Sequence, residues 1–297
     1  MSKSSTIIRV FPRRTSATPV DSLTVINRGP GLGLGYDFDA VDEVHVSCTF
    51  TWDLPRAHWL VRQWGRVADV KLGGPALDAK GGEFVVGRYL KPGCVITSRG
   101  CPNHCWFCAA WRREGRKIRE LEIKDGWNVF DNNILACSEK HVRNVFRMLR
   151  RQSEPIEFTG GLEAKILQRW HAKLLASIRF NSVYFAYDTP DDWEPLVNAS
   201  KLLQSVSGLN FNSAKSLSSS DIISYKFRCY VLIGYKKDTI EKAVDRLTRT
   251  CKLGFVPFAM LFNKDIQSGE WRATQRLWSG NKRQVSAKFK SILTGAQ

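Results

Sequence analysis

The sequence predicts an α/β fold: a partial (β/α)6 barrel of six parallel strands, preceded by a small N-terminal β-α-β segment. From residue 95 onward, short apolar runs alternate with longer runs that have helical periodicity. Strands that alternate with helices in this way are typical of a parallel sheet with helices outside it. Only six apolar runs of strand length occur, too few for a complete eight-stranded barrel, so we expect an open one.

Composition is ordinary for a globular protein. The 297 residues are 43% hydrophobic and 25% charged, which suits one large α/β domain or two smaller ones. No apolar run reaches the ~18–20 residues of a membrane span, and the first residues lack the apolar stretch of a secretion signal. Five of the eight cysteines stand singly in apolar or strand-like stretches, as in reduced intracellular proteins. We therefore expect a cytoplasmic protein with no membrane association.

The front of the chain has two parts. Residues 1–42 show little periodicity and are expected to be irregular; their glycine-rich run 29–35 lacks the flanking strand and helix of a dinucleotide-binding loop. Residues 43–90 form the β-α-β segment. Apolar residues alternate from Val44 to Trp52, as in a strand. Asp53 and Pro55 then indicate the start of a helix to about residue 64, and 67–72 reads as a second strand.

The predicted core barrel covers residues 91–262 and is followed by a basic tail, 263–297. The expected strands are 95–97, 128–130, 156–159, 183–187, 227–233 and 256–261. The expected helices are 139–151, 162–178, 193–206 and 239–252. The serine-rich stretch 213–220 is expected to be an exposed loop. Polar or glycine-rich residues follow the strands, and in parallel α/β barrels such strand ends carry the working residues.

Positive charge is concentrated in a few segments. The net charge is +17, and residues 271–297 contain no acid. Other basic clusters follow residue 111 and lie on the predicted helix 139–151. Basic surfaces bind nucleic acid through counterion release, so nucleic acid is one expected partner. A solvated basic surface with no such partner is the alternative.

Three cysteines, Cys101, Cys105 and Cys108, have the spacing Cys-x3-Cys-x2-Cys. Three thiolates on one short loop suit a [4Fe–4S] cluster and leave its fourth iron open. A zinc site completed by His104 is the alternative, and with the basic surface it would indicate a nucleic-acid-binding module without catalysis. Four ligands within eight residues strain a tetrahedral zinc site, so the spacing favours the cluster. A cluster-bearing scaffold without catalysis is a third hypothesis.

Over about residues 90–262 these features resemble the radical S-adenosylmethionine (SAM) superfamily, in which Phe107 would be the aromatic residue before the third cysteine. The resemblance implies that Cys101, Cys105 and Cys108 hold a [4Fe–4S] cluster whose open iron chelates SAM, and that the Phe107 backbone lies near the adenine. It further implies reductive cleavage of SAM to a 5′-deoxyadenosyl radical, which abstracts hydrogen from an unidentified substrate. A flavodoxin or ferredoxin would supply the electron.

A second motif supports the same resemblance. Gly160-Gly161-Leu162-Glu163 is similar to the Gly-Gly-Glu motif that binds the SAM amino group, with Leu162 inserted. The resemblance assigns cofactor contacts to this turn and to the ends of the two following strands. The residues implied are Thr159, Gly160, Gly161, Glu163, Asp188 at the ribose, and Ile233 at the adenine.

The front segment also has a family resemblance. Its strand–helix–strand unit looks like a shortened form of the domain that precedes the barrel in cobalamin-type radical SAM proteins. Cobalamin binding in that domain usually brings an Asp-x-His-x-x-Gly motif, and no such motif occurs in this sequence. We therefore expect the chain to bind no cobalamin.

Overall fold

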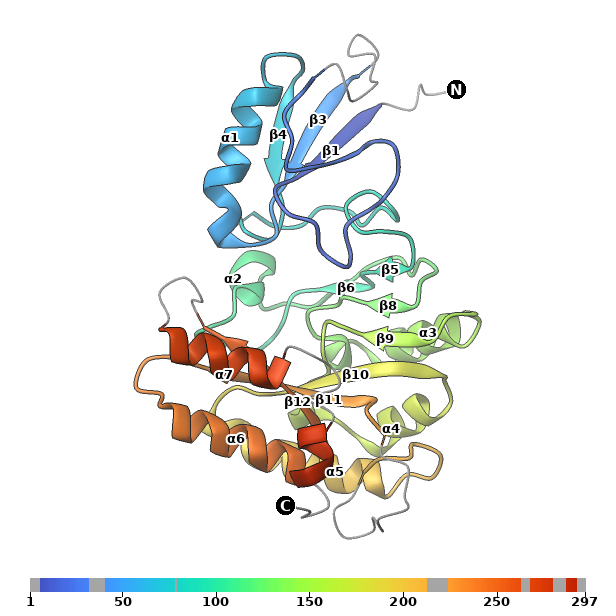
Figure 1. Ribbon diagram of the computed structural model, residues 1–297. Helices are drawn as coiled ribbons and strands as arrows, with labels where there is room; N and C mark the ends of the chain where they lie inside the picture. The colour runs from blue at the N-terminus through green and yellow to red at the C-terminus, as the bar shows by residue number, and fades with distance from the viewer. Residues whose placement is uncertain are drawn as a thin grey trace. The chain divides into compact units, whose positions relative to one another are not determined.

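The structure is a computed structural model that describes residues 6–31, 41–77, 79–212, 224–262, 268–279 and 287–292. It divides into two compact units, Met1–Lys124 and Asp125–Gln297. Both units combine parallel strands with helices, which confirms the predicted α/β class (Figure 1). The finer predicted boundaries at residues 42, 90 and 262, and the barrel curvature, stay predictions.

The first unit contains a parallel four-stranded sheet in the order β2-β1-β3-β4. Its strands are β1 (Ile7–Phe11), β2 (Thr24–Ile26), β3 (Glu43–Ser47) and β4 (Val70–Gly73), and helix α1 (Leu54–Trp64) joins β3 to β4. The expectation that residues 1–42 are irregular is therefore wrong. β1 is too short and too uniformly buried to show an alternating pattern, because every residue after Ile7 is buried. β2 also precedes the glycine-rich run, most of which (32–35) lies outside the described residues.

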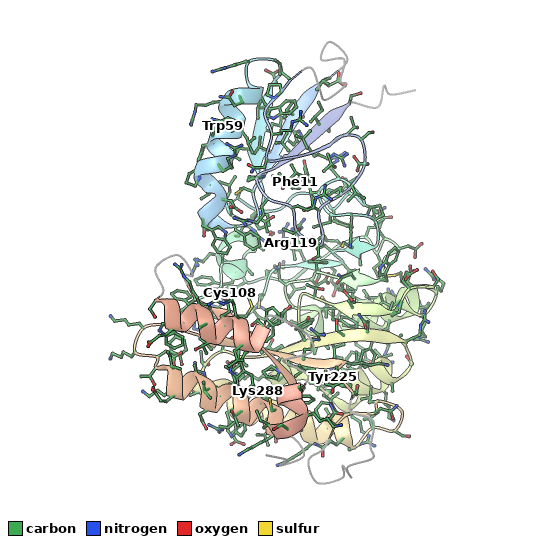
Figure 2. The ribbon with its side chains drawn as sticks, in the orientation of Figure 1. Phe11, Trp59, Cys108, Arg119, Tyr225 and Lys288 are labelled. Carbon is green, nitrogen blue, oxygen red and sulfur yellow. The ribbon has the colours of Figure 1, made fainter. Side chains whose placement is uncertain are left out.

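Burial explains how this sheet holds together. Val10, Val44 and Val46 have no exposed surface, and α1 packs Leu60 and Trp64 into the same core. The Trp64 Nε1 hydrogen donates to the Arg28 carbonyl at 2.9 Å, which satisfies its polar atom inside that core. Phe11 and Trp59 are labelled in Figure 2; Trp59 carries the Arg56 guanidinium 3.7 Å above its ring.

The rest of the first unit consists of short elements around the cysteines. They are β5 (Cys94–Val95), β6 (Ser98–Arg99), α2 (Ala110–Glu114) and β7 (Arg119–Glu120). β6 and β7 pair antiparallel, Ser98 opposite Glu120. The loop Cys101–Cys108 thus lies between β6 and α2.

Within the second unit, five strands are parallel in the order β12-β11-β10-β9-β8. They are β8 (Asn128–Val129), β9 (Ile156–Phe158), β10 (Phe180–Tyr187), β11 (Phe227–Ile233) and β12 (Val256–Leu261). All five were predicted, the last two with the same bounds. The strand order follows the chain order, which brings successive carboxyl ends to neighbouring positions along one edge.

Helices α3 (Glu139–Leu149), α4 (Arg169–Ala176), α5 (Trp193–Gln204), α6 (Ile240–Lys252) and α7 (Gly269–Ser279) belong to the second unit. The predicted helix 162–178 is wrong in its first half, where the structure has a 3-10 turn, Ala164–Ile166. The positive φ of Gly161 and extended Glu163 keep the chain out of helix there. Gln168 and His171 cap α4 instead. The serine-rich stretch 213–220 lies outside the described residues. Among the helices described, none has both the length and the hydropathy to cross a bilayer.

Candidate functional site

The cysteine loop is closed at its base by backbone contacts. Gly100 precedes it with a φ of +92°, and a Cβ there would overlap the Lys117 carbonyl oxygen, so only glycine fits. The Cys101 N–H donates to the Gly115 carbonyl at 3.2 Å. The two chain segments that flank the loop are therefore held together, and the three cysteines lie on a short, closed turn.

The thiols themselves are accessible. Cys105 is exposed, Cys101 and Cys108 are partly buried, and no disulfide joins any of the eight cysteines, all of which are described. The Cys108 Sγ accepts a hydrogen bond from the Ala110 N–H at 3.4 Å. Hydrogen bonds of this kind stabilise the thiolate, which is the form that binds iron. The donor set therefore fits a thiolate-bound cluster.

Side chains from α2 and the segment after it fix the backbone of the loop. Trp111 Nε1 donates to the Cys105 carbonyl at 2.9 Å, and Arg112 Nη1 donates to the Trp106 carbonyl at 3.3 Å. Arg116 Nε donates to the Pro102 carbonyl at 3.1 Å. Trp106 is 51% exposed. It meets Phe107, the predicted adenine neighbour, edge to face, and Phe107 is half-buried.

The alternative zinc site has a geometric requirement that can be checked. A tetrahedral ion needs four ligands that converge on one point. Throughout the described residues, no three His, Cys, Asp or Glu side chains converge in a way that could hold a metal ion. The side chains of Cys101, His104, Cys105 and Cys108 are therefore not gathered into a metal site of either kind. A four-iron cluster likewise needs its three thiolates arranged around one cubane, each on a different iron, so the metal content of the protein distinguishes the zinc alternative from the cluster.

The strand ends of the second unit carry the other residues that the sequence singled out. After β9 the chain turns through Gly160, whose N–H donates to the Val129 carbonyl at 3.0 Å. A Cβ on Gly160 would overlap the Asp131 carbonyl oxygen and lie 2.9 Å from the Phe130 carbonyl carbon. The glycine therefore permits a backbone approach between the ends of β8 and β9 that no other residue allows.

Side chains then link the same two strand ends. Asn133 Nδ2 donates to the Glu163 carboxylate at 2.5 Å, and Thr159 Oγ1 donates to the Asn128 side chain at 2.7 Å. Tyr230, on β11, donates its hydroxyl to the Thr159 carbonyl at 3.3 Å. Thr159, Gly160, Gly161 and Glu163 thus lie at the carboxyl edge of the sheet. Their role toward a cofactor stays a prediction.

Asp188 directly follows β10 and links that strand to β11. Its Oδ1 accepts the Leu232 N–H of β11 at 3.1 Å. Burial, and next the nearby Asp192 carboxylate, raise the pKa of Asp188 to about 7. Asp192 is fixed in place, because its Oδ2 accepts both the Asp188 and Thr189 N–H groups at 2.9 and 2.8 Å. Asp188 therefore titrates near neutrality at the strand edge.

A buried ion pair, which the sequence did not predict, holds the end of β11 in place. Arg246 on α6 bonds Asp238 at 2.8 Å, and both side chains are almost fully buried. Arg246 Nη2 also donates to the Leu232 carbonyl at 2.9 Å, and Asp238 accepts the Gly234 N–H at 2.9 Å. Ile233, the predicted adenine contact, lies between these anchors with no exposed surface. No sequence motif relates the two partners of this pair.

Comparisons with known proteins are informative at the level of fold. No known family profile matches the sequence, and neither does any curated protein. Among the solved structures that share the fold are two of one protein. Both are of TsrM from Kitasatospora setae, described as a radical SAM methyltransferase. The structure with cobalamin and a [4Fe–4S] cluster superposes with a TM-score of 0.59 at 12% identity, covering 87% of this chain and 75% of TsrM. The structure with tryptophan substrate and a SAM analogue gives 0.53 at 13% identity, covering 87% and 73%.

Proposed function

We propose that this protein is a radical SAM enzyme that holds a [4Fe–4S] cluster on Cys101, Cys105 and Cys108. The observation that carries the proposal is the closed cysteine loop, with an N–H group directed at the Cys108 sulfur, in a chain that has the fold of a radical SAM methyltransferase. When bound and reduced, the cluster would supply the electron that cleaves SAM to a 5′-deoxyadenosyl radical. We also propose that its strands form a partial barrel and that the protein works in the cytoplasm, a reducing compartment.

The chain's own residues would position the cofactor. Backbone acceptors in the turn from Thr159 to Gly161 can approach an ammonium closely, because Gly160 and Gly161 carry no side chain. Glu163 is held by Asn133, which fixes the position of its carboxylate. Asp188 can donate a hydrogen bond while protonated and accept one while ionised, which suits a ribose hydroxyl.

The direct test is anaerobic reconstitution with iron and sulfide, followed by SAM and dithionite. We expect about four irons per chain and formation of 5′-deoxyadenosine. Cys101→Ser, Cys105→Ser and Cys108→Ser should each lose both, whereas Cys137→Ser, a matched control outside the loop, should keep both. Stoichiometric zinc with no iron after anaerobic purification would contradict the proposal.

The reaction outcome needs a second readout. Because both of these TsrM structures are of a methyltransferase, the same assay should follow S-adenosylhomocysteine as well as 5′-deoxyadenosine. Methyl transfer leaves the former, and hydrogen abstraction leaves the latter. Turnover with deuterated candidate substrates then identifies the hydrogen donor, since deuterium appears in 5′-deoxyadenosine only when that substrate loses it.

For the substrate class we propose nucleic acid or a molecule attached to it. The support is the net charge of +17 and the exposed Arg112, Arg116 and Lys117 beside exposed Trp106. Cations and an exposed aromatic are the groups that bind phosphates and stack on bases. We expect labelled RNA to bind at low salt and to dissociate steeply toward moderate salt. Arg112→Gln/Arg116→Gln should reduce the salt slope. Absence of binding at low salt contradicts this substrate class and leaves the cluster assignment intact.

A further inference from the structure

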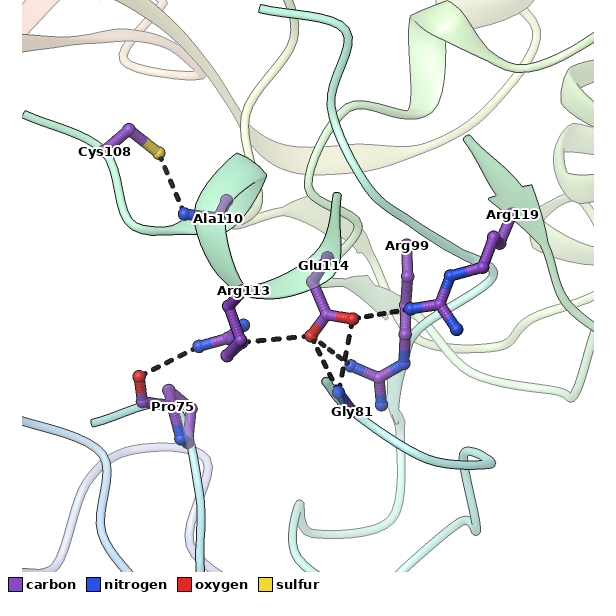
Figure 3. A network of polar contacts seen from close by, with 8 residues as sticks. All are labelled: Pro75, Gly81, Arg99, Cys108, Ala110, Arg113, Glu114 and Arg119. Atoms are coloured by element: carbon purple, nitrogen blue, oxygen red, sulfur yellow. Dashed lines mark hydrogen bonds and ion pairs between the residues drawn. The ribbon is translucent and has the colours of Figure 1, made fainter. Parts of the chain in front are cut away.

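Three arginines converge on one buried carboxylate next to the cysteine loop (Figure 3). Glu114 ends α2, and its side chain has no exposed surface. It accepts from Arg99 Nη1 at 3.3 Å, Arg113 Nε at 3.0 Å and Arg119 Nη2 at 2.7 Å. The Gly81 N–H also donates to both of its oxygens, at 3.2 and 3.3 Å. We call Glu114 and these three arginines the Glu114 network.

The network has more positive than negative charge. One carboxylate faces three guanidiniums, and no other acid forms an ion pair with these arginines within the described chain. Arg99 and Arg113 are largely buried, and the buried Nε groups of Arg99 and Arg119 have no hydrogen-bond acceptor among the described residues. Buried charge without a partner is costly. The Glu114 network carries a surplus of two positive charges.

The network is attached to both ends of the cysteine loop. Arg99 stands two residues before Cys101, and Glu114 ends the helix that begins directly after the loop. Gly115, next to Glu114, accepts the Cys101 N–H. Cys108 and Arg119 are both labelled in Figure 2 within this part of the first unit. A [4Fe–4S] cluster on three thiolates is a negative group at this location, and one-electron reduction makes it more negative.

We propose that the Glu114 network supplies the positive charge that stabilises the reduced cluster, so that its arginines set the cluster's reduction potential. The inference rests on the proposed function. Positive charge near a redox centre favours the state with the added electron, because the Coulomb energy of that state falls. Burial limits screening by salt, which makes the effect larger than that of surface arginines. In the cell an external one-electron donor reduces the cluster; in the test, dithionite does.

The test separates charge from geometry at Arg119, the most exposed arginine of the network. Arg119→Gln removes one charge, and Arg119→Lys keeps the charge without the planar guanidinium. Each protein is reconstituted anaerobically, its iron content is measured, and the cluster is titrated with dithionite while EPR monitors the reduced state. We expect unchanged iron content, a lower potential in Arg119→Gln, and a potential near wild type in Arg119→Lys. Arg143→Gln, which removes an exposed arginine from α3, should have the wild-type potential.

Two results overturn the inference: an Arg119→Gln potential equal to wild type, or an equal shift in Arg143→Gln. If Arg119→Gln does not fold, Arg113→Gln applies the same test, and its potential should also fall. A wild-type chain that takes up no iron contradicts the proposed function, and this inference with it. A wild-type cluster whose potential ignores both arginine substitutions contradicts the inference alone.

Discussion

Gly160→Ala tests how closely the ends of β8 and β9 must approach. The added Cβ would overlap the Asp131 carbonyl oxygen and contact the Phe130 carbonyl carbon at 2.9 Å and the Asp131 nitrogen at 3.0 Å. All three are backbone atoms, so no rotamer change relieves the overlap. Ordinary contact requires the two segments to separate by about 1 Å, and close-packed interiors resist such movement.

The expected loss of stability is that of an overpacked site, about 2 kcal/mol. For a unit of this size that lowers Tm by about 4–8 °C. If the proposed function holds, SAM binding should weaken as well, because the shift displaces the backbone acceptors that we propose for its amino group. A lost hydrogen bond to a charged group costs about 1.5–3 kcal/mol, which is roughly a tenfold to hundredfold rise in Kd.

Thermal unfolding and equilibrium dialysis of labelled SAM on reconstituted protein measure the two effects. Gly269→Ala is the matched control in the same unit, since a Cβ there meets no atom within 4 Å. It should change stability by no more than about 0.5 kcal/mol and leave SAM binding unchanged. If Gly160→Ala behaves like this control in both assays, the reasoning from the close backbone approach is refuted.

Three further predictions concern other residues. Asp188→Asn should remove a pH dependence of stability. The pKa of Asp188 is raised to about 7 from the ordinary 3.8, so the carboxyl ionises at lower pH in the unfolded chain than in the folded one. Wild type should therefore lose stability relative to the variant as pH rises from about 4 to 7, by an amount on the order of a few kcal/mol, with no further change above 7. Denaturant titrations across that range measure it, and parallel stability profiles would contradict it. Arg246→Met should destabilise the second unit by about 3–5 kcal/mol, because it leaves the Asp238 carboxylate buried without its partner. The double variant Arg246→Met/Asp238→Leu should recover much of that loss. If stability does not recover, the unpaired charge is not the cause of the loss. Incubation with hydroxocobalamin followed by gel filtration should leave no corrinoid absorbance on the protein, since no histidine stands in an Asp-x-His-x-x-Gly motif, and a co-eluting corrinoid would contradict this.

The second unit could be predicted well because its signals are local. The strands there lie in short stretches rich in apolar residues, and β11 and β12 have the predicted bounds. The first half of predicted helix 162–178 failed for a local reason as well. Apolar spacing there is compatible with a helix, yet the backbone at Gly161 and Glu163 is committed to the turn beside β8. Tertiary contacts decided the conformation over periodicity.

The first 42 residues were harder to predict because β1 and β2 are short, and almost all of β1 is buried. Arg9 on β1 illustrates the difficulty. A charged residue in the middle of a run argues against a buried strand, yet Arg9 is only 7% exposed. Its guanidinium pairs with Asp21 and donates to the Gly87 carbonyl at 2.9 Å. Both partners come from loops whose positions no local pattern encodes, so the strand could be recognised only from the assembled fold.

In the candidate site, too, residue spacing in the sequence predicts the motifs, whereas the residues that hold those motifs in place are known only from the fold. The cysteine triplet and the glycine pair are visible in sequence, because their chemistry depends on residues a few positions apart. The groups that hold them come from far along the chain: Asn133 lies thirty residues from Glu163, and Gly81 lies thirty-three residues from Glu114. A basic cluster after the cysteines could be noticed only as charge. The buried Glu114 carboxylate holds three arginines in fixed positions. Guanidiniums in fixed positions can change the reduction potential of a nearby redox centre more than mobile surface arginines can.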